Sequence, residues 1–153
     1  MSGDVTKRKT ELMRTIVRGS RKKRHGRNST QFESFVKHYF ANVPPQDLVD
    51  KGPSTVLALA KLHWRFGAKR KKGKPLVRAY NPSQKHHGYA SDHTVIEIIT
   101  DDMPFLVNSV IAVFTRLKLT IHLVIHPVLR VRRSANGKLT EVFETSSQLE
   151  EQA

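Results

Sequence analysis

Eight histidines and one pair of neighbouring aspartates are the side chains of this sequence with the clearest capacity for chemistry. Histidine binds metals and transfers protons, and two close carboxylates are a frequent arrangement for acid–base work. The chain has no cysteine, which excludes disulfide bonds, thiolate metal sites and a cysteine nucleophile. None of its eight glycines belongs to a GxGxxG or P-loop pattern, so the sequence predicts no nucleotide site.

The histidines do not predict a metal site. His122 and His126 fall on the same face of an expected strand, but four residues of strand separate them by roughly 13 Å, too far for one metal ion. A second group lies in one polar loop and consists of His86, His87, Asp92 and His93. These side chains would chelate a metal only if the loop folded back on itself, so we interpret them as exposed loop residues.

Asp101 and Asp102 stand directly before Met103 and Pro104, a combination typical of a helix start. Asp102 suits the N-cap and Pro104 the first turn, where carboxylates complement the free amide groups and the helix dipole. We favour this structural role for the two aspartates over acid–base catalysis. Ligand binding at the same turn is a separate question.

Two helices and a short strand are expected before that turn. Residues 31–41 place their aromatic and aliphatic side chains on one helical face, and these are expected to form core rather than a ligand site. Residues 54–66 form a second, broadly apolar helix that ends at Gly67. Residues 76–80 are a strand candidate closed by Asn81 and Pro82, and residues 83–92 form a polar loop.

The elements after His93 have sharper signals. Residues 94–100 are rich in β-branched side chains and predict a strand, and the apolar face of residues 104–118 predicts a helix. Residues 121–131 alternate with period two, which predicts a long strand with one face in the core. Asn136 and Gly137 mark a hairpin turn before a returning strand at residues 139–143. The pattern as a whole is α+β.

The formal net charge of +14 suggests a nucleic-acid or other polyanion partner. Residues 1–31 hold ten basic and two acidic side chains, residues 32–90 eleven and three, and residues 91–153 six and eight. The excess therefore lies outside the sharply patterned C-terminal third. The candidate polyanion contacts are Arg21, Lys22, Lys23, Arg24, Lys71 and Lys72. We favour a solvated tail and loop as the interpretation of these runs.

The most apolar window, residues 103–114, is too short for a membrane span, which needs about 20 apolar residues.

Two longer stretches carry a specific resemblance to a known family: residues 94–110 (TVIEIITDDMPFLVNSV) and residues 121–133 (IHLVIHPVLRVRR). Weaker support comes from residues 38–45, 63–66 and 77–82. Over residues 32–143 the sequence resembles the N-terminal, ACT-like regulatory region of the large bacterial NAD-specific glutamate dehydrogenases. The resemblance does not extend to the basic N-terminal run.

The resemblance implies an ACT-like module, with strand, helix, strand, strand, helix and strand in that order. Such modules bind amino acids at the turn between the first strand and helix, usually across a dimer interface. The candidate effector-binding turn is thus Asp101, Asp102, Met103, Pro104 and Phe105. Phe105 replaces the glycine of the family pattern, whose missing side chain lets a ligand approach the backbone closely. Asn108 stands where the family more often has an aspartate.

The family's reaction is the NAD-dependent deamination of glutamate to 2-oxoglutarate and ammonia, and its catalytic domain lies far downstream. No nicotinamide- or glutamate-binding residue can be carried over, so we expect no cofactor in this chain and no activity of the chain alone. The second helix and last strand of the module are missing, which predicts a fragment, such as a split gene or a frameshifted copy. The expected partners are the rest of the dehydrogenase polypeptide or its other subunits, and an amino-acid effector.

We therefore predict an α+β chain in four parts: a basic, disordered tail (residues 1–30), a helical preface with a short strand and a loop (31–92), a partial ACT-like, ferredoxin-like module (93–145) and a polar tail (146–153). Its predicted function is that of a cytoplasmic regulatory or assembly segment of a glutamate dehydrogenase. The alternative is a basic module that binds nucleic acid or another polyanion. A structural remnant without activity is the third hypothesis.

Overall fold

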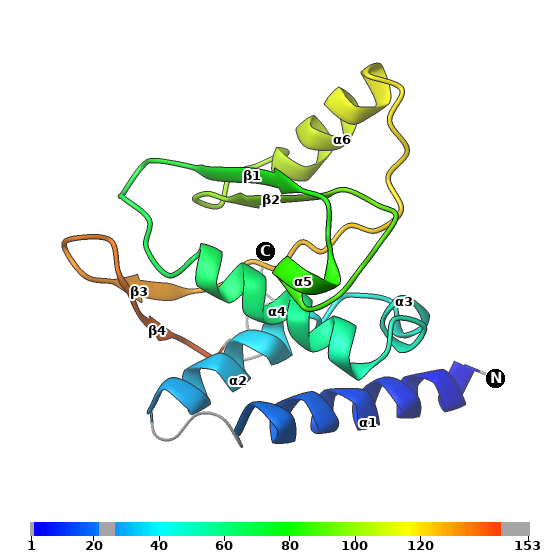
Figure 1. Cartoon of the computed structure of the whole chain (residues 1–153). Coiled ribbons are helices and arrows are strands. Elements are labelled where there is room, and N and C mark those ends of the chain that lie inside the picture. Colours follow the sequence, from blue (N-terminus) through cyan, green and yellow to red (C-terminus); the bar gives the residue numbers. More distant parts are fainter. Residues whose placement is uncertain (1, 22–26, 145–153) are drawn as a thin grey trace, which may run out of the picture.

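The computed structural model describes residues 2–21 and 27–144, and Figure 1 shows their arrangement. The first four helices form one layer, two short antiparallel sheets lie above and beside it, and the last helix lies beyond the upper sheet. The helices are α1 (Ser2–Arg21), α2 (Arg27–Tyr39), α3 (Pro45–Val49), α4 (Pro53–Phe66), α5 (Gln84–His87) and α6 (Leu106–Arg116). The strands are β1 (Leu76–Tyr80), β2 (Val95–Ile99), β3 (Val131–Arg133) and β4 (Leu139–Val142). The predicted α+β class with a helical N-terminus is confirmed.

The hydrophobic core lies in the helical layer, where α1, α2, α3 and α4 pack against one another. α2 is central because its apolar residues recur every three or four positions and so share one face. Phe32 and Val36 are completely buried, and the rings of Phe35 and Tyr39 stack with centroids 5.1 Å apart. The prediction that this aromatic stripe forms core is confirmed. The buried apolar residues are Leu12, Ile16, Phe32, Phe35, Val36, Tyr39, Phe40, Val43, Leu48, Val56 and Ala60.

α1 occupies most of the segment that was predicted to be a disordered tail. Its few apolar side chains are enough to dock it, because Leu12 and Ile16 lie one helical turn apart and are both buried in the core. Lys9 donates to two backbone carbonyls in the turn after α2, and Arg21 forms an ion pair with Glu33. Residues 2–21 are therefore helical, where the sequence left residues 5–17 open as a short helix and predicted disorder from Gly19 onward. Residues 22–26 lie outside the described residues.

β1 and β2 form an antiparallel pair that lies over α4 (Figure 1). Both strands were predicted, and their register places Arg78 opposite Glu97. These two charged side chains point to the same face, because cross-strand partners share a side of the sheet. Glu97 is only 6% exposed, so this face is the one that meets the helical layer.

The predicted strand over residues 121–131 does not form a ladder. Only its last residue belongs to a strand, since β3 begins at Val131 and pairs with β4. The period-two burial is nevertheless present, because Leu123, Ile125 and Leu129 are half-buried against the core. The alternating side chains thus order this segment in an extended form. As far as Leu129 its backbone has no hydrogen-bonded backbone partner among the described residues, and the Arg130 carbonyl then accepts from the Phe143 amide at 2.9 Å. The predicted hairpin turn is confirmed, with Gly137 at φ +86°.

The start of α6 also differs from the prediction. Phe105, at φ +62°, is the N-cap residue, and the helix begins at Leu106. Asp102 is therefore not the N-cap, and Pro104 does not lie in the first turn.

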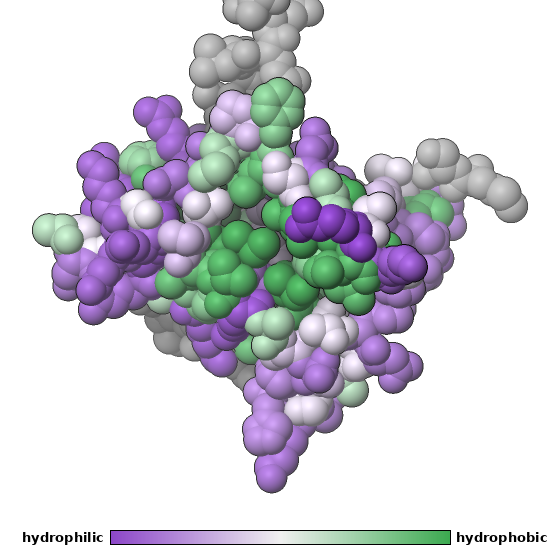
Figure 2. All heavy atoms as spheres, turned by 90° about the horizontal axis from the view of Figure 1, so that it is seen from above, coloured by the Kyte–Doolittle hydropathy of each residue, from purple (hydrophilic) through white to green (hydrophobic). Residues whose placement is uncertain are grey.

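α6 carries apolar side chains that the rest of the described chain leaves uncovered. None of its residues is buried, and Ile111 and Val113 are 37% and 41% exposed. Seen from above, hydrophobic side chains gather at the centre of the face that holds α6 and the β1–β2 pair, ringed by hydrophilic ones (Figure 2). A monomeric protein rarely leaves a large contiguous apolar patch in water, so this face is suited to contact with another surface.

Candidate functional site

The turn between β2 and α6, predicted as the effector-binding site, lies at the surface. Asp101 forms an ion pair with Arg70, and the side chains are 61% and 9% exposed, respectively. This bond ties Asp101 to the loop after α4, and Asp101 lies four residues before Phe105, the N-cap of α6. Asp102 remains exposed beside it.

The same turn borders a small recess of about 140 Å³. It is lined by Met103, Phe105, Leu106, Val107, Asn108 and His126. Phe105 has a positive φ of 62°, a conformation that glycine adopts readily and that other residues adopt at an energetic cost. The backbone here thus takes a conformation that suits the glycine of the family pattern, although the side chain is phenylalanine. That side chain is 75% exposed and stands at the edge of the recess.

A buried ionic cluster joins the sheet to the helical layer. Glu97 accepts two hydrogen bonds from Arg78 at Oε1, at 2.8 and 3.1 Å, while its Oε2 lies 2.7 Å from His63 Nδ1. The Arg78 guanidinium also donates to the Leu62 carbonyl at 3.1 Å and lies over the Phe66 ring, 4.3 Å from its centroid. Every partner comes from α4 or β1, so the cluster fixes β2 against α4.

The electrostatics of the cluster favour the ionised carboxylate. Burial by itself would raise the pKa of Glu97, but hydrogen bonds from His63 and then Arg78, together with their charges, outweigh it and hold that pKa below its ordinary value. Both carboxylate oxygens are occupied and the side chain is 7% exposed. Glu97 is therefore bound as a structural anion and has no free oxygen to offer a substrate. The sequence signal that could have found it is one carboxylate within an otherwise aliphatic strand.

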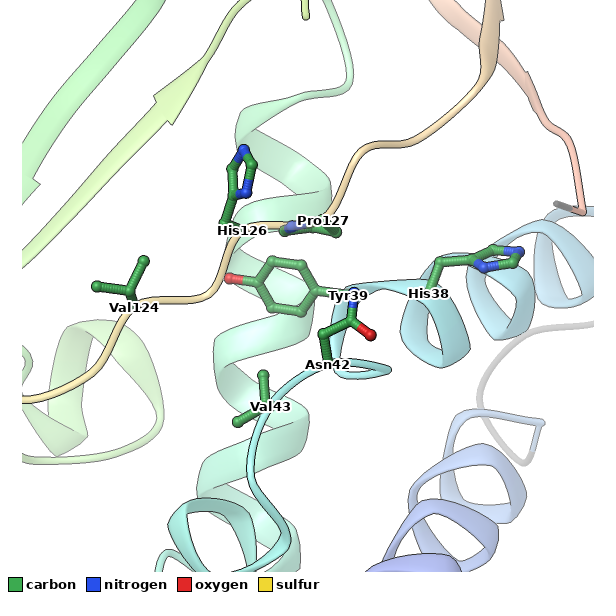
Figure 3. A pocket seen from close by; sticks show the side chains of 7 residues that line it. All are labelled: His38, Tyr39, Asn42, Val43, Val124, His126 and Pro127. Carbon is green, nitrogen blue, oxygen red and sulfur yellow. The ribbon is translucent and has the colours of Figure 1, made fainter. Parts of the chain in front are cut away.

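A second recess, of about 250 Å³, lies between the end of α2 and the extended segment after α6 (Figure 3). It is lined by His38, Tyr39, Asn42, Val43, Val124, His126 and Pro127. The hydroxyl of Tyr39 and the ring of His126 lie on the same side of it, whereas His38 points to the other side. Burial, and then the charges of Glu97 and Tyr89, raise the pKa of Tyr39, so its hydroxyl stays protonated at neutral pH.

Two of the three histidines in the predicted loop group, His87 and His93, form ring stacks. His87 lies against Tyr80, with centroids 4.6 Å apart, and its Nδ1 accepts a hydrogen bond from the Ser83 amide at 2.9 Å. His93 stacks on His122 with centroids 3.9 Å apart. Within residues 2–21 and 27–144, no group of three or more histidine, aspartate, glutamate or cysteine side chains is placed to hold a metal ion.

The predicted polyanion contacts fall into three groups. Arg21 is engaged in its ion pair with Glu33, and Lys71 and Lys72 are exposed in the loop between α4 and β1. Lys22, Lys23 and Arg24 lie outside the described residues.

Comparison with known proteins identifies the family. Residues 35–153 match the family described as "Glutamate dehydrogenase, ACT1 domain". The chain belongs to this family. The matched residues start within α2 and include the elements from α3 to β4, whereas α1 lies before them.

Two relatives of this ACT1 chain are NAD-specific glutamate dehydrogenases. The protein of Pseudomonas aeruginosa is 35% identical over 118 residues, which cover 77% of this chain and 7% of that protein. The protein of Halomonas elongata is 32% identical over 114 residues, which cover 74% of this chain and 7% of that protein. The ACT1 chain thus corresponds to an N-terminal region that is a small fraction of these relatives.

No solved structure matches the ACT1 chain. The cofactor NAD appears in the names of the two relatives and is a property of those whole proteins. In the described part of this chain, no helix is long and apolar enough to cross a membrane.

Proposed function

We propose that this ACT1 chain is a regulatory and assembly segment of a large NAD-dependent glutamate dehydrogenase, and that it works in the cytoplasm. In the whole enzyme, glutamate would be converted to 2-oxoglutarate and ammonia by residues outside this chain. The observation that carries the assembly role is α6, an amphipathic helix without a single buried residue. Removing an apolar helix face from water lowers the free energy by about 25 cal/mol per Å² of buried apolar surface. The exposed face of α6 therefore favours contact with further parts of the enzyme.

The isolated chain is expected to show no glutamate-dependent formation of NADH. The residues that bind nicotinamide and glutamate are proposed to lie outside this chain, and the buried Glu97 carboxylate is occupied by His63 and Arg78. The assay measures absorbance of NADH with glutamate and NAD, and the full-length enzyme of Pseudomonas aeruginosa serves as the positive control. Clear turnover by the purified chain would refute the proposal.

The regulatory role would be exercised at the turn from Asp101 to Phe105. Three features support an amino acid as the ligand. The exposed carboxylate of Asp102 can accept hydrogen bonds from an ammonium group. The first amides of α6 are free to donate to a carboxylate, because the first turn of a helix lacks intrahelical acceptors. The recess beside Met103 and Leu106 can hold a short apolar side chain.

Changing Asp102 to alanine is expected to weaken amino-acid binding roughly ten- to a hundredfold, because a hydrogen bond to a charged group contributes about 1.5–3 kcal/mol. Calorimetric titration with acidic, basic and neutral amino acids measures this. The matched control is Asp92→Ala, which removes another exposed aspartate, from the loop before β2, and should leave binding unchanged. If Asp102→Ala leaves amino-acid binding unchanged, the proposed binding site at this turn is wrong. If no amino acid binds, the proposed sensing role is wrong, and the proposed assembly role is not affected.

A further inference from the structure

Two basic segments that are far apart in the sequence meet at one place in the fold. Lys69 and Lys138 face each other as partners in an isolated antiparallel bridge. The Arg70 amide donates to the Gly137 carbonyl at 2.9 Å, and the Leu139 amide donates to the Ala68 carbonyl at 2.8 Å. We call the surface formed by residues 69–74 and 132–138 the basic junction. It was not predictable as a unit, because about 60 residues separate its halves.

The basic junction is short of negative charge. Its two segments hold eight basic side chains and no acidic one. The acids that contact it are Asp101, which pairs with Arg70, and Glu141, which pairs with Arg132 at 2.7 Å. Five lysines remain exposed: Lys69, Lys71, Lys72, Lys74 and Lys138. Like charges placed directly opposite each other on neighbouring strands destabilise the pairing, so a bound anion would relieve a strain built into this contact.

One buried and one half-buried arginine, Arg70 and Arg133, underlie these lysines. Arg70 donates to the Lys74 carbonyl at 3.0 Å and to Asp101, and Arg133 donates to the carbonyls of Gly67 and Gly137 at 2.8 and 3.1 Å. The Nε atoms of both arginines are buried and have no partner among the described residues. Burial, with the nearby Arg70 charge adding to it, lowers the pKa of Arg133. The positive charge of the junction is thus only partly balanced by the protein.

We propose that the basic junction binds a compact polyphosphate group, such as the linked phosphates of a small metabolite. Clustered ammonium groups suit a ligand with several negative charges at short spacing, and lysine binds phosphate as a point charge. Neither segment of the junction has an aromatic side chain, which single-stranded nucleic acid requires for base stacking. The site is independent of the amino-acid site, although the Arg70–Asp101 pair places the two next to each other.

The probe for this site is inorganic tripolyphosphate, titrated into the purified chain by calorimetry and by thermal unfolding. The wild type is expected to bind it and to melt at a higher temperature in its presence, because a ligand that binds only the folded state stabilises it. The double variant Lys69→Gln/Lys138→Gln is expected to lose affinity by about tenfold or more. Without the probe, the same variant should melt no lower than the wild type, because the opposed charges are gone.

The matched control is Lys37→Gln/Lys51→Gln, which removes two exposed lysines outside the basic junction and makes the same change in net charge. It should retain the affinity of the wild type. Equal losses in both double variants would show a response to overall charge and would overturn the site. The proposal also fails if tripolyphosphate does not bind at low salt, or if oligonucleotides bind with an affinity that grows with their length while tripolyphosphate does not compete.

Discussion

Replacing Glu97 by glutamine is expected to lower the free energy of unfolding by about 3 kcal/mol, because it breaks a buried ion pair and leaves the Arg78 guanidinium uncompensated. The glutamine is nearly the same size, so the packing of β2 on α4 is preserved and the loss of charge is isolated. Arg78 would keep its bond to the Leu62 carbonyl, and its two bonds to the carboxylate would become weaker bonds to a neutral amide oxygen. Urea unfolding followed by circular dichroism measures the change.

Glu141→Gln is the matched control, because it makes the same chemical change at an exposed ion pair. Its partner Arg132 has a side chain that is 64% exposed, and surface pairs of this kind contribute about 0–1 kcal/mol. If the two substitutions destabilised the chain equally, the cluster around Glu97 would not hold the sheet to the helices.

The pH dependence follows from the lowered pKa of Glu97. A carboxylate whose pKa is lower in the folded state contributes stability above its unfolded pKa, near 4.3, and loses that contribution as the pH falls through the folded value. The difference in unfolding free energy between the wild type and Glu97→Gln should therefore shrink from pH 5 towards pH 3. A constant difference over this range would contradict the assignment.

Replacing Gly137 by alanine is expected to destabilise the chain by about 2–4 kcal/mol, because two penalties act together. Gly137 has φ +86°, which side chains rarely adopt, and a Cβ there would lie 2.3 Å from the carbonyl oxygen of Arg70. That oxygen belongs to the backbone and cannot rotate away. The hairpin must therefore move off the loop after α4, and the bond from the Arg70 amide to the Gly137 carbonyl is lost.

Gly73→Ala separates the two penalties. Gly73 has a similar φ of +72°, but a Cβ at this position would meet nothing within 4 Å. In this control the free energy of unfolding should fall by only about 1–2 kcal/mol, because only the unfavourable backbone conformation acts. Urea unfolding of both variants gives their free energies of unfolding. The additional destabilisation of Gly137→Ala over Gly73→Ala is the energetic cost of a side chain between the hairpin and the loop. Equal losses would mean that the hairpin does not dock there.

Local sequence patterns predicted many of the helices and strands but few of the long-range side-chain contacts. The helix around Phe35 and the strands on either side of residues 81–94 were predictable, because helical and strand periodicity are properties of adjacent residues. The turn at Gly137 was predictable because few residues adopt its backbone conformation. The docking of α1 was missed, because Leu12 and Ile16 form an apolar stripe too narrow to distinguish from a polar tail.

The candidate site shows the same limit. The turn from Asp101 to Phe105 was found from its composition, but the bond between Asp101 and Arg70, 31 residues earlier, was not predictable from it. Glu97 meets His63 across 34 residues, and no spacing rule connects a helix to a strand over that distance. Such pairs depend on how the layers pack, so they become visible only in the folded structure.

The extended segment between Thr120 and Leu129 has an entropic consequence. Its backbone forms no hydrogen bond with the backbone of another described residue, yet its side chains are already sorted into an inner and an outer row. Fixing a backbone into one conformation costs about 1–2 kcal/mol of conformational entropy per residue. In this segment the burial of Leu123, Ile125 and Leu129 offsets much of that cost. A strand that pairs with this segment would form a ladder of hydrogen bonds, and most of the backbone entropy lost on pairing would be that of the incoming strand. The segment is thus preorganised for sheet extension.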